Sequence, residues 1–549
     1  MEMVLLELML ASATASATSC SVLHHGAVAD NATDNTQAFR RAATCAAAGE
    51  DGGVMLVPAG VFMTAPFNLS SNTVLRVEGT ISGLHTPASY PVVTGQPVDE
   101  MYRAPWYGNR QHQALVAAYS ATNVTVAGAG TIDGNGWPWW DNQTACSGRH
   151  NSTWKPNASQ SACLIQRPKL VEFVDCEDVA LRGDAADAPL TLMNSPFWTW
   201  HPTFCKRVRA QYVEFRAVRR LLARLLARLL AHLLACLLAD SPPQPRDHGN
   251  TDGVDPDSCD DVHVQDVLID VGDDAVSVKS GLHWKTLKKV PAQNYVFERT
   301  TILFRNFAIG SDVSGDVRNI TFRDSHIGSD DGSSPWAIKI KTDSQEGGIV
   351  DGIYFRVRRL LARLLARLLT LLLADSPPQN LTLGNITYCG SSRFVFTPPH
   401  AKKSSCISGH EKGASMIDMS MGYVGAKTNP GRVTNVVFDG LHGIGPTGLM
   451  LGASGLPNAS GCPGCVEHMV NVTLKNVHLT QGAGIWNCAD LDGLKVQDVH
   501  PFNAAKSTCK LKLDDEGLGK KKKGKGKGKV KQVTWWVLRV LLVAIRSYF

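Results

Sequence analysis

Short stretches in which apolar and polar residues alternate recur from about residue 123 to residue 499. Each begins with a polar turn residue, runs as one short alternating stretch, and passes through Asn, Asp or Gly into a second. Alternation with period two, rich in β-branched residues, predicts strands rather than helices. The clearest copies are NVTVAGAGTIDG at Asn123, DVHVQDVLIDV at Asp261, RNITFRDSHIG at Arg318, NVVFDGLHGIG at Asn435, NVTLKNVHL at Asn471 and GLKVQDVHP at Gly493.

The spacing of these copies, roughly 20 to 30 residues, is typical of a solenoid. Strands this short, with no helices between them, favour an all-β fold in which each coil stacks on the next, a parallel β-helix. A β-sandwich is the alternative, but sandwiches seldom extend over so long a region. A solenoid needs a covered end, and Ser21–Glu50 supplies one, because its AFRRAATCAAA stretch has high helix propensity.

Two Leu/Arg-rich segments, Val218–Gln244 and Val357–Gln379, interrupt the repeats. Both contain RRLLARLLARLL and end in LLADSPPQ, and this pattern predicts helices that are apolar nearly all round. Codons for the initial Val begin with GT, and one codon for the final Gln ends in AG, as the ends of introns do. Removing both segments joins VEFRA to PRDHGNTDG and IYFR to NLTLGNIT, which restores the repeat. We therefore interpret them as translated introns, with a regulatory pair of amphipathic helices as the alternative.

Deleting Val218–Gln244 and Val357–Gln379 together is expected to give a more soluble and more active protein. A Leu-rich helix inserted just before Asn250 must either protrude as an apolar surface or pack over neighbouring coils. Expression yield, oligomeric state and activity of the two forms test this, and sequencing the transcript across both segments tests the intron interpretation directly. A full-length chain that is monomeric, soluble and more active than the deletion would make the helices functional parts.

The basic net charge of +6 is not a property of the repeats. Each Leu/Arg-rich segment carries four Arg and one Asp, and the Lys/Gly-rich tail Gly517–Phe549 carries eight Lys and two Arg. Without them the main body is acidic, so we expect no nucleic-acid partner. We expect the tail to be a solvated low-complexity segment. No apolar run is both long enough and free enough of charge to predict a membrane-spanning helix.

Cysteine and sequon content indicate an oxidising, secretory route. The chain has 14 Cys, with close pairs at 146 and 163, 389 and 406, 462 and 465, and 488 and 509. Residues 1–20 resemble a secretion signal, although Glu2 and Glu7 replace the usual basic start. We therefore expect a secreted or cell-wall glycoprotein with one main domain over residues 21–516. The sequons lie at Asn31, Asn68, Asn123, Asn142, Asn151, Asn157, Asn319, Asn380, Asn385, Asn458 and Asn471.

Three carboxylates stand about one coil apart, at Asp252 and at the Asp273–Asp274 pair. Stacked coils would bring them together, and like charges that close cannot all ionise freely. At least one pKa should rise, which places an acid beside bases, as glycoside hydrolysis requires. Acidic turns that cap strands or bind calcium are the alternative. Cys462-Pro-Gly-Cys465 lacks a second ligand pair at zinc-finger spacing, and we expect no metal or cofactor.

The sequence resembles glycoside hydrolase family 28, the pectin-degrading polygalacturonase family, including its plant-type members. The resemblance covers about Gly26 to Val499, apart from the two Leu/Arg-rich segments. The Gly-His-Gly motif of many members is missing at Phe304–Gly310. The motifs are NTDG at Asn250, GDD at Gly272, IKIKT at Ile338–Thr342, GTIDGNGWPWW at Gly130–Trp140, RPKLVEF at Arg167–Phe173, SPFWTWHPTFC at Ser195–Cys205 and AIGSDVSG at Ala308–Gly315.

The resemblance implies a right-handed parallel β-helix that hydrolyses α-1,4-galacturonosyl bonds with inversion. It implies that Asp273 is the general acid and that Asp252 and Asp274 hold and activate the water. Lys341 would bind a galacturonate carboxylate, and Lys339 stands where many members have Arg or His. We also place His201 and Asn250 in the substrate site.

We expect a monomeric hydrolase of pectic galacturonan. The alternatives are a related hydrolase of xylogalacturonan or rhamnogalacturonan, a β-helix polysaccharide lyase, and a non-catalytic β-helix. Three converging carboxylates favour hydrolysis, because a lyase needs a basic residue as proton acceptor.

Overall fold

The computed structural model forms two compact units, Met1–Lys512 and Leu513–Phe549. It describes residues 20–49, 52–93, 110–140, 165–217, 249–281, 289–327, 337–342, 347–356, 415–420, 432–443, 449–454, 469–479, 485–489, 491–492, 494–500, 506–509 and 512–513. The signal-like segment, both Leu/Arg-rich segments, the Lys/Gly-rich tail and the cysteines at 146, 163, 389, 406, 462 and 465 lie outside these residues. No helix in the described part of the chain could span a membrane.

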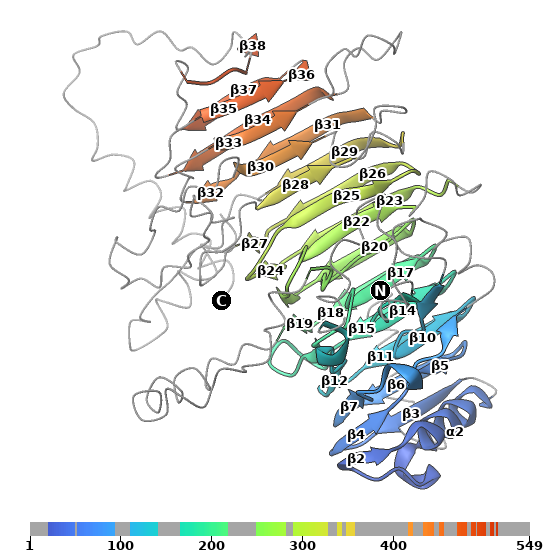
Figure 1. Cartoon of the computed structure of the whole chain (residues 1–549). Coiled ribbons are helices and arrows are strands. Elements are labelled where there is room, and N and C mark those ends of the chain that lie inside the picture. Colours follow the sequence, from blue (N-terminus) through green and yellow to red (C-terminus); the bar gives the residue numbers. More distant parts are fainter. Residues whose placement is uncertain are drawn as a thin grey trace, which may run out of the picture. The chain divides into compact units, whose positions relative to one another are not determined.

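The first unit is a stack of parallel strands in which each strand pairs with its counterpart one coil away (Figure 1). This confirms the predicted parallel β-helix. The longest sheet contains, in spatial order, β1 (Cys20–Ser21), β3 (Gly53–Val57), β6 (Thr73–Val77), β11 (Thr122–Ala127), β15 (Glu177–Arg182), β18 (Lys206–Gln211), β20 (Asp260–Gln265), β23 (Ala292–Glu298), β26 (Val317–Arg323), β29 (Ile349–Arg356), β31 (Arg432–Asp439), β34 (Met469–Leu479) and β37 (Lys495–His500). Two short strands, β32 (His442–Gly443) and β36 (Leu491–Asp492), also pair with β34.

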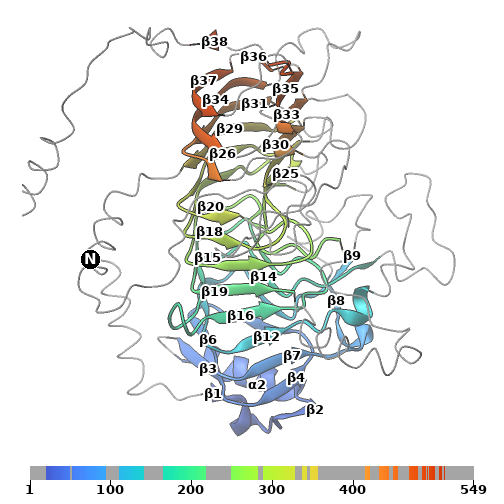
Figure 2. The same cartoon turned by 90° about the vertical axis from the view of Figure 1, so that its left-hand side faces the viewer.

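A second sheet follows the first around each coil (Figure 2). It contains β2 (Asp30–Asp34), β4 (Val61–Thr64), β7 (Thr80–Gly83), β12 (Thr131–Asp133), β16 (Leu190–Met193), β19 (Val213–Arg216), β21 (Leu268–Asp270), β24 (Thr301–Ile302) and β27 (His326–Ile327). Both sheets continue in register from β18 and β19 to β20 and β21. The Leu/Arg-rich segment that begins at Val218 therefore enters between strands and does not shift the stacking.

The third side, which we call the charged sheet, is built from two runs of strands. The first run is β5 (Phe67–Leu69), β10 (Val116–Tyr119), β14 (Val171–Val174) and β17 (Trp200–Thr203). The second is β22 (Val276–Ser280), β25 (Phe307–Val313), β28 (Ile338–Lys341), β30 (Ser415–Ser420), β33 (Leu449–Ser454) and β35 (Ile485–Ala489). Isolated bridges through Val254 and Asp257 connect β17 to β22.

The remaining elements are short. A small sheet joins β8 (Val92–Val93), β9 (Arg110–His112) and β13 (Ile165–Gln166). Two 3-10 turns are η1 (Val22–His25) and η2 (Pro87–Ser89), and β38 (Lys512–Leu513) spans the sequence boundary between the two units.

In several repeats the residue that follows the first strand adopts the left-handed backbone conformation. Asp266 (φ 53°) and Asp324 (φ 51°) turn the chain from the first sheet toward the second, and Tyr212 (φ 55°) and Arg299 (φ 49°) occupy the same place in other repeats. Short polar side chains and Gly tolerate a positive φ far better than branched residues do. The polar interruptions in the sequence pattern are therefore the corners of the coil.

The N-terminal end is covered as predicted, by helix α2 (Thr36–Ala47). Its buried face packs against the first coil, and the disulfide Cys20–Cys45 ties the helix to β1. A second disulfide, Cys488–Cys509, joins the pair that the sequence places 21 residues apart. Cys176, Cys205 and Cys259 are buried free thiols, so not every cysteine in the described part of the chain is paired.

Apolar side chains from all three sheets form one continuous core. Phe307 contacts Phe297, Phe322 and Phe355 with ring centroids 5.1, 4.7 and 5.6 Å apart, so aromatic rings from successive coils touch along the stack. Such contacts stabilise each coil only through its neighbours, as expected of a solenoid.

Candidate active site

Alternation along the charged sheet sends one set of side chains into the core and the other set to the opposite face. Val276 and Val278 lie in the core, whereas Lys279 lies on the other face; in β28 the core residues are Ile338 and Ile340. The side chains of the second set are charged on several successive strands. They include Glu172, His201, Asp257, Lys279, Lys339, Lys341 and Asp418.

The structure brings the three predicted carboxylates to equivalent places on adjacent coils. Val254 pairs with Val276, so Asp252 and Asp274 both lie two residues before a bridged position. The Gly253 N–H donates to the Asp274 carbonyl at 3.0 Å. Asp252 and Asp274 are buried, whereas Asp273 is half-buried and is the most accessible of the three.

The backbone holds the Asp273 carboxylate in place. Its Oδ2 accepts the Asn250 N–H at 2.6 Å and its Oδ1 accepts the Asp274 N–H at 3.0 Å. Asn250 has a left-handed backbone (φ 62°), which Asn tolerates. Asn250, which was predicted to lie in the substrate site, therefore also orients the Asp273 carboxylate through its backbone N–H.

Burial and neighbouring charges separate the proton affinities of these carboxylates. Burial raises the pKa of Asp252 well above its usual range, and the carboxylates of Asp255 and Asp273 add to the effect. Burial also acts on Asp274, but the ammonium groups of Lys341 and Lys279 outweigh it and hold the pKa of Asp274 below its ordinary value. One carboxylate thus favours the protonated form while another, one coil away, favours the ionised form.

Lys341 forms a buried ion pair with Asp274. Its Nζ lies 2.5 Å from the Asp274 Oδ2, and both side chains are nearly fully buried. Lys339 lies two residues earlier on β28, on the same face, and burial followed by repulsion from Lys341 lowers its pKa. Both lysines were expected to bind the substrate, and the pairing of Lys341 with the carboxylate predicted to activate water was not foreseen.

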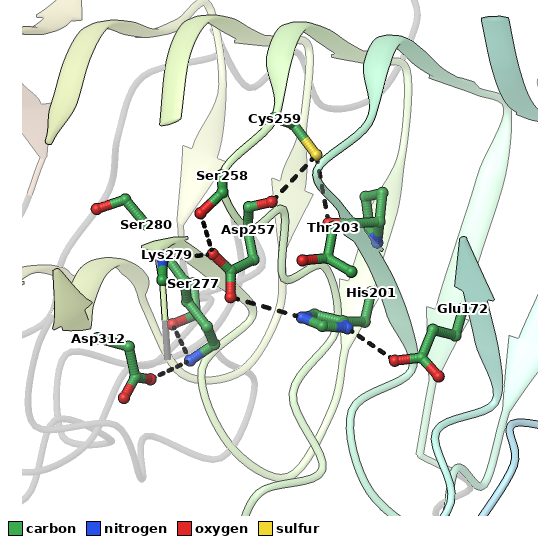
Figure 3. Close-up of polar contacts among 12 residues, drawn as sticks. Glu172, His201, Thr203, Asp257, Ser258, Cys259, Ser277, Lys279, Ser280 and Asp312 are labelled. Atoms are coloured by element: carbon green, nitrogen blue, oxygen red, sulfur yellow. Dashed lines mark hydrogen bonds and ion pairs between the residues drawn. The ribbon is translucent and has the colours of Figure 1, made fainter. Parts of the chain in front are cut away.

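His201 is enclosed by protein carboxylates (Figure 3). Its Nδ1 lies 3.2 Å from the Glu172 Oε1, and its Nε2 lies 3.9 Å from the Asp257 Oδ2, which is too long for a hydrogen bond. The ring is fully buried. These contacts position neighbouring charges, and the assignment of His201 to a substrate subsite stays a prediction.

Asp255 was not foreseen in the site. It is fully buried, and neither of its carboxylate oxygens has a hydrogen-bond partner within the described part of the chain. Burial raises the pKa of Asp255 well above its usual range, although Lys279 opposes the shift.

Lys279 links several of the charged groups. Its Nζ lies 3.0 Å from the Ser277 Oγ and 3.5 Å from the Asp312 Oδ2 (Figure 3). The same Nζ lies 4.5 Å from the Trp198 ring centroid.

Lys169 and Glu172 form a second unforeseen group. The Lys169 Nζ lies 2.9 Å from the Glu172 Oε1 and donates to the Gln111 Oε1 at 2.7 Å. Burial opposes ionisation of Glu172, but Lys169 and His201 outweigh it and lower the pKa of Glu172 to about 2. Lys279 in VSVKS and Glu172 in LVEFV each stand directly after an apolar residue of a strand. A charged residue at such a position is the sequence signal that could have identified both.

A parallel β-helix that gathers paired carboxylates and lysines on one sheet has the parts of a glycoside hydrolase. Residues 231–360 match the model of glycosyl hydrolases family 28. A probable polygalacturonase of Vitis vinifera is 30% identical over 348 residues, which cover 62% of this chain and 60% of that protein. Over the parts that these matches cover, the chain is similar to the polygalacturonases of glycoside hydrolase family 28.

Two solved structures share the fold. The polygalacturonase of Erwinia carotovora superposes with a TM-score of 0.52 at 17% identity, over 89% of this chain and 96% of that one. The exopolygalacturonase of Thermotoga maritima superposes with a TM-score of 0.50 at 19% identity, over 90% of both chains. Sequence identity to the curated relatives is confined to part of them: the matched region spans 60% of the Vitis protein and 44% of a probable polygalacturonase of Arabidopsis thaliana.

Proposed function

We propose that this chain hydrolyses α-1,4-galacturonosyl bonds of pectic galacturonan with inversion at the anomeric carbon. The observation that carries the proposal is the meeting of Asp252, Asp273 and Asp274, in which Asp273 is the most accessible carboxylate and Lys341 holds the pKa of Asp274 low. Inverting hydrolysis needs a protonated acid on one side of the glycosidic bond and a carboxylate on the other. The similarity of the chain to polygalacturonases supports the choice of substrate.

In the proposed mechanism Asp273 is the acid, because it is the most accessible of the three carboxylates. Its proton passes to the glycosidic oxygen as the bond from that oxygen to the anomeric carbon breaks. A water oxygen attacks the same carbon from the opposite side, and Asp274, kept ionised by Lys341, accepts a proton from that water. Asp252 orients the water through a hydrogen bond.

Recognition of the substrate is assigned to local cations. The main body of the chain is acidic and the proposed substrate is a polyanion, so long-range attraction opposes binding. Lys341 and Lys339 are two cations on the same face of β28 beside the carboxylates, and they are the proposed partners of galacturonate carboxylates.

Lys341→Ala is expected to weaken binding of charged galacturonan much more than binding of a methyl-esterified chain. The same change removes the cation that holds the pKa of Asp274 low, so that pKa rises and the acidic limb of the activity profile moves to higher pH. Binding assays on both polymers and pH–rate profiles measure the two effects. Lys206→Ala, at an exposed lysine on β18, is the control and should change neither. Equal losses on both polymers with an unmoved profile would show that Lys341 is only structural.

Product analysis separates hydrolysis from the alternatives. Incubation with polygalacturonate should release reducing ends without unsaturated, ultraviolet-absorbing products, and chelators should leave the rate unchanged. Unsaturated products would identify a lyase. Cleavage of xylogalacturonan or rhamnogalacturonan faster than polygalacturonate would identify that polymer as the preferred substrate. No cleavage of any of these polymers would indicate a non-catalytic β-helix.

We also propose that the protein is secreted as a monomeric cell-wall enzyme. The disulfides Cys20–Cys45 and Cys488–Cys509 support an oxidising compartment. Secretion assays and sedimentation of the purified chain test this proposal.

A further inference from the structure

The last coils of the solenoid carry histidines at the same place in the repeat. His442 on β32, His478 on β34 and His500 on β37 occupy one register position on paired strands. In the sequence they are the fourth residues of DGLH, KNVH and QDVH. Neighbouring strands in a sheet lie about 4.8 Å apart, so the backbone fixes the spacing of His478 and His500.

Asp498 completes a compact group with two of these histidines. The Nε2 of His478 lies 2.9 Å from the Asp498 Oδ2, and the Nε2 of His500 lies 3.4 Å from the Asp498 Oδ1. The three potential ligand atoms all lie within 4.8 Å of one another. The group is open to solvent, with the side chain of His500 72% exposed and that of Asp498 46% exposed.

We propose that His478, His500 and Asp498 bind a divalent transition-metal ion of the zinc class. Two imidazoles and one carboxylate are ligands that zinc accepts, with water in the fourth position of a tetrahedron. Ligand bonds of about 2.0–2.1 Å place tetrahedral ligand atoms roughly 3.4 Å apart. The two contacts, 2.9 and 3.4 Å to different oxygens of Asp498, lie near that value, and rotation of the side chains would bring the three ligand atoms, now within 4.8 Å of one another, around one ion. Calcium and magnesium prefer all-oxygen sites and do not match this set.

Such an ion would cross-link β34 and β37, the neighbouring strands that carry the two histidines. Coils near the end of a solenoid have few coils beyond them to support their stacking, which makes them easier to open than coils in the middle. Because an ion that binds only the folded chain stabilises it by mass action, the site would secure this end of the stack. The inference is independent of the proposed hydrolysis, since the group contains none of the residues assigned to catalysis.

Calorimetric titration of the full-length chain with zinc chloride, purified without a histidine tag, tests the inference. The wild type should bind one ion, and His500→Ala and Asp498→Asn should each weaken binding by at least about tenfold. His24→Ala, at an exposed histidine of η1, is the matched control and should leave the affinity unchanged. Zinc should raise the Tm of the wild type and of His24→Ala but not that of His500→Ala.

Circular dichroism of each variant without metal shows whether the fold is retained. The absence of saturable zinc binding to the wild type would overturn the proposal. Equal affinity in the wild type and both site variants would overturn it too, because it would place the ion elsewhere on the chain.

Discussion

Asp273→Asn is expected to lower the turnover of polygalacturonate by about 10²–10⁴-fold while substrate binding is retained. The amide has nearly the shape of the carboxyl group, and its single oxygen can still accept one of the two hydrogen bonds that the Asn250 and Asp274 N–H groups donate to the two carboxylate oxygens. What it cannot do is deliver a proton to the leaving oxygen. Initial-rate kinetics together with a binding assay on the same variant measure both halves of the expectation.

Asp178→Asn provides the control for this substitution. Asp178 is an exposed carboxylate on β15 paired with Arg207, and its replacement should leave turnover unchanged. Near-normal turnover of Asp273→Asn would remove Asp273 as the acid. The anomer released by the wild type provides a second check, since NMR showing retention would contradict attack by a water placed between separated carboxylates.

Glu172→Gln is expected to lower the free energy of unfolding by about 3–5 kcal/mol. Lys169 and Glu172 form a fully buried ion pair, and the amide would leave the Lys169 ammonium without its counter-charge. The cost arises because a buried charge cannot recover its lost hydration. Denaturant unfolding of both proteins at neutral pH measures the difference.

A matched ion pair on the surface provides the control. The Lys206 Nζ also lies 2.9 Å from a glutamate oxygen, that of Glu177, but both side chains are exposed. Glu177→Gln should therefore change the stability by no more than about 1 kcal/mol. Equal effects of the two substitutions would contradict the role given to burial.

The stability difference caused by Glu172→Gln should depend on pH. The pKa of Glu172 is lowered from 4.5 to about 2 in the folded chain, so its contribution is fully present above pH 4.5 and is lost as the pH falls toward 2. The gap between wild type and variant should shrink over that range. A double variant, Lys169→Met with Glu172→Leu, should lose less than Glu172→Gln alone, because no unpaired charge remains.

The repeat pattern was sufficient to predict the stacked coils. Period-two alternation identified strands such as β20 and β26, and the Asp or Asn between strand pairs identified the corners, because few residues tolerate a positive φ. The spacing of Asp252 from Asp273 and Asp274 predicted that they would meet, since one coil separates them. These features depend on local conformation and on a regular repeat, both of which are visible in one sequence.

Partner choice among charged side chains could not be predicted in the same way. Whether Lys341 contacts a substrate or Asp274 depends on side-chain directions and local burial, and the same is true of the contact between His201 and Glu172. The bond between Cys20 and Cys45 was likewise hidden, because disulfide connectivity follows the packing of α2 on the first coil.

The buried ion pairs between coils have a consequence for how the chain avoids misfolding. In a stack of similar coils, apolar contacts alone would tolerate a strand that pairs one or two residues out of place. A slip of one residue would turn Glu172 toward the core, and a slip of two would separate it from His201, its partner in the observed register. The contact of Asp274 with Lys341 sets the same condition two coils further along. These contacts form only in the native register. A coil that pairs out of register would lose them and would therefore be less stable than the natively paired coil.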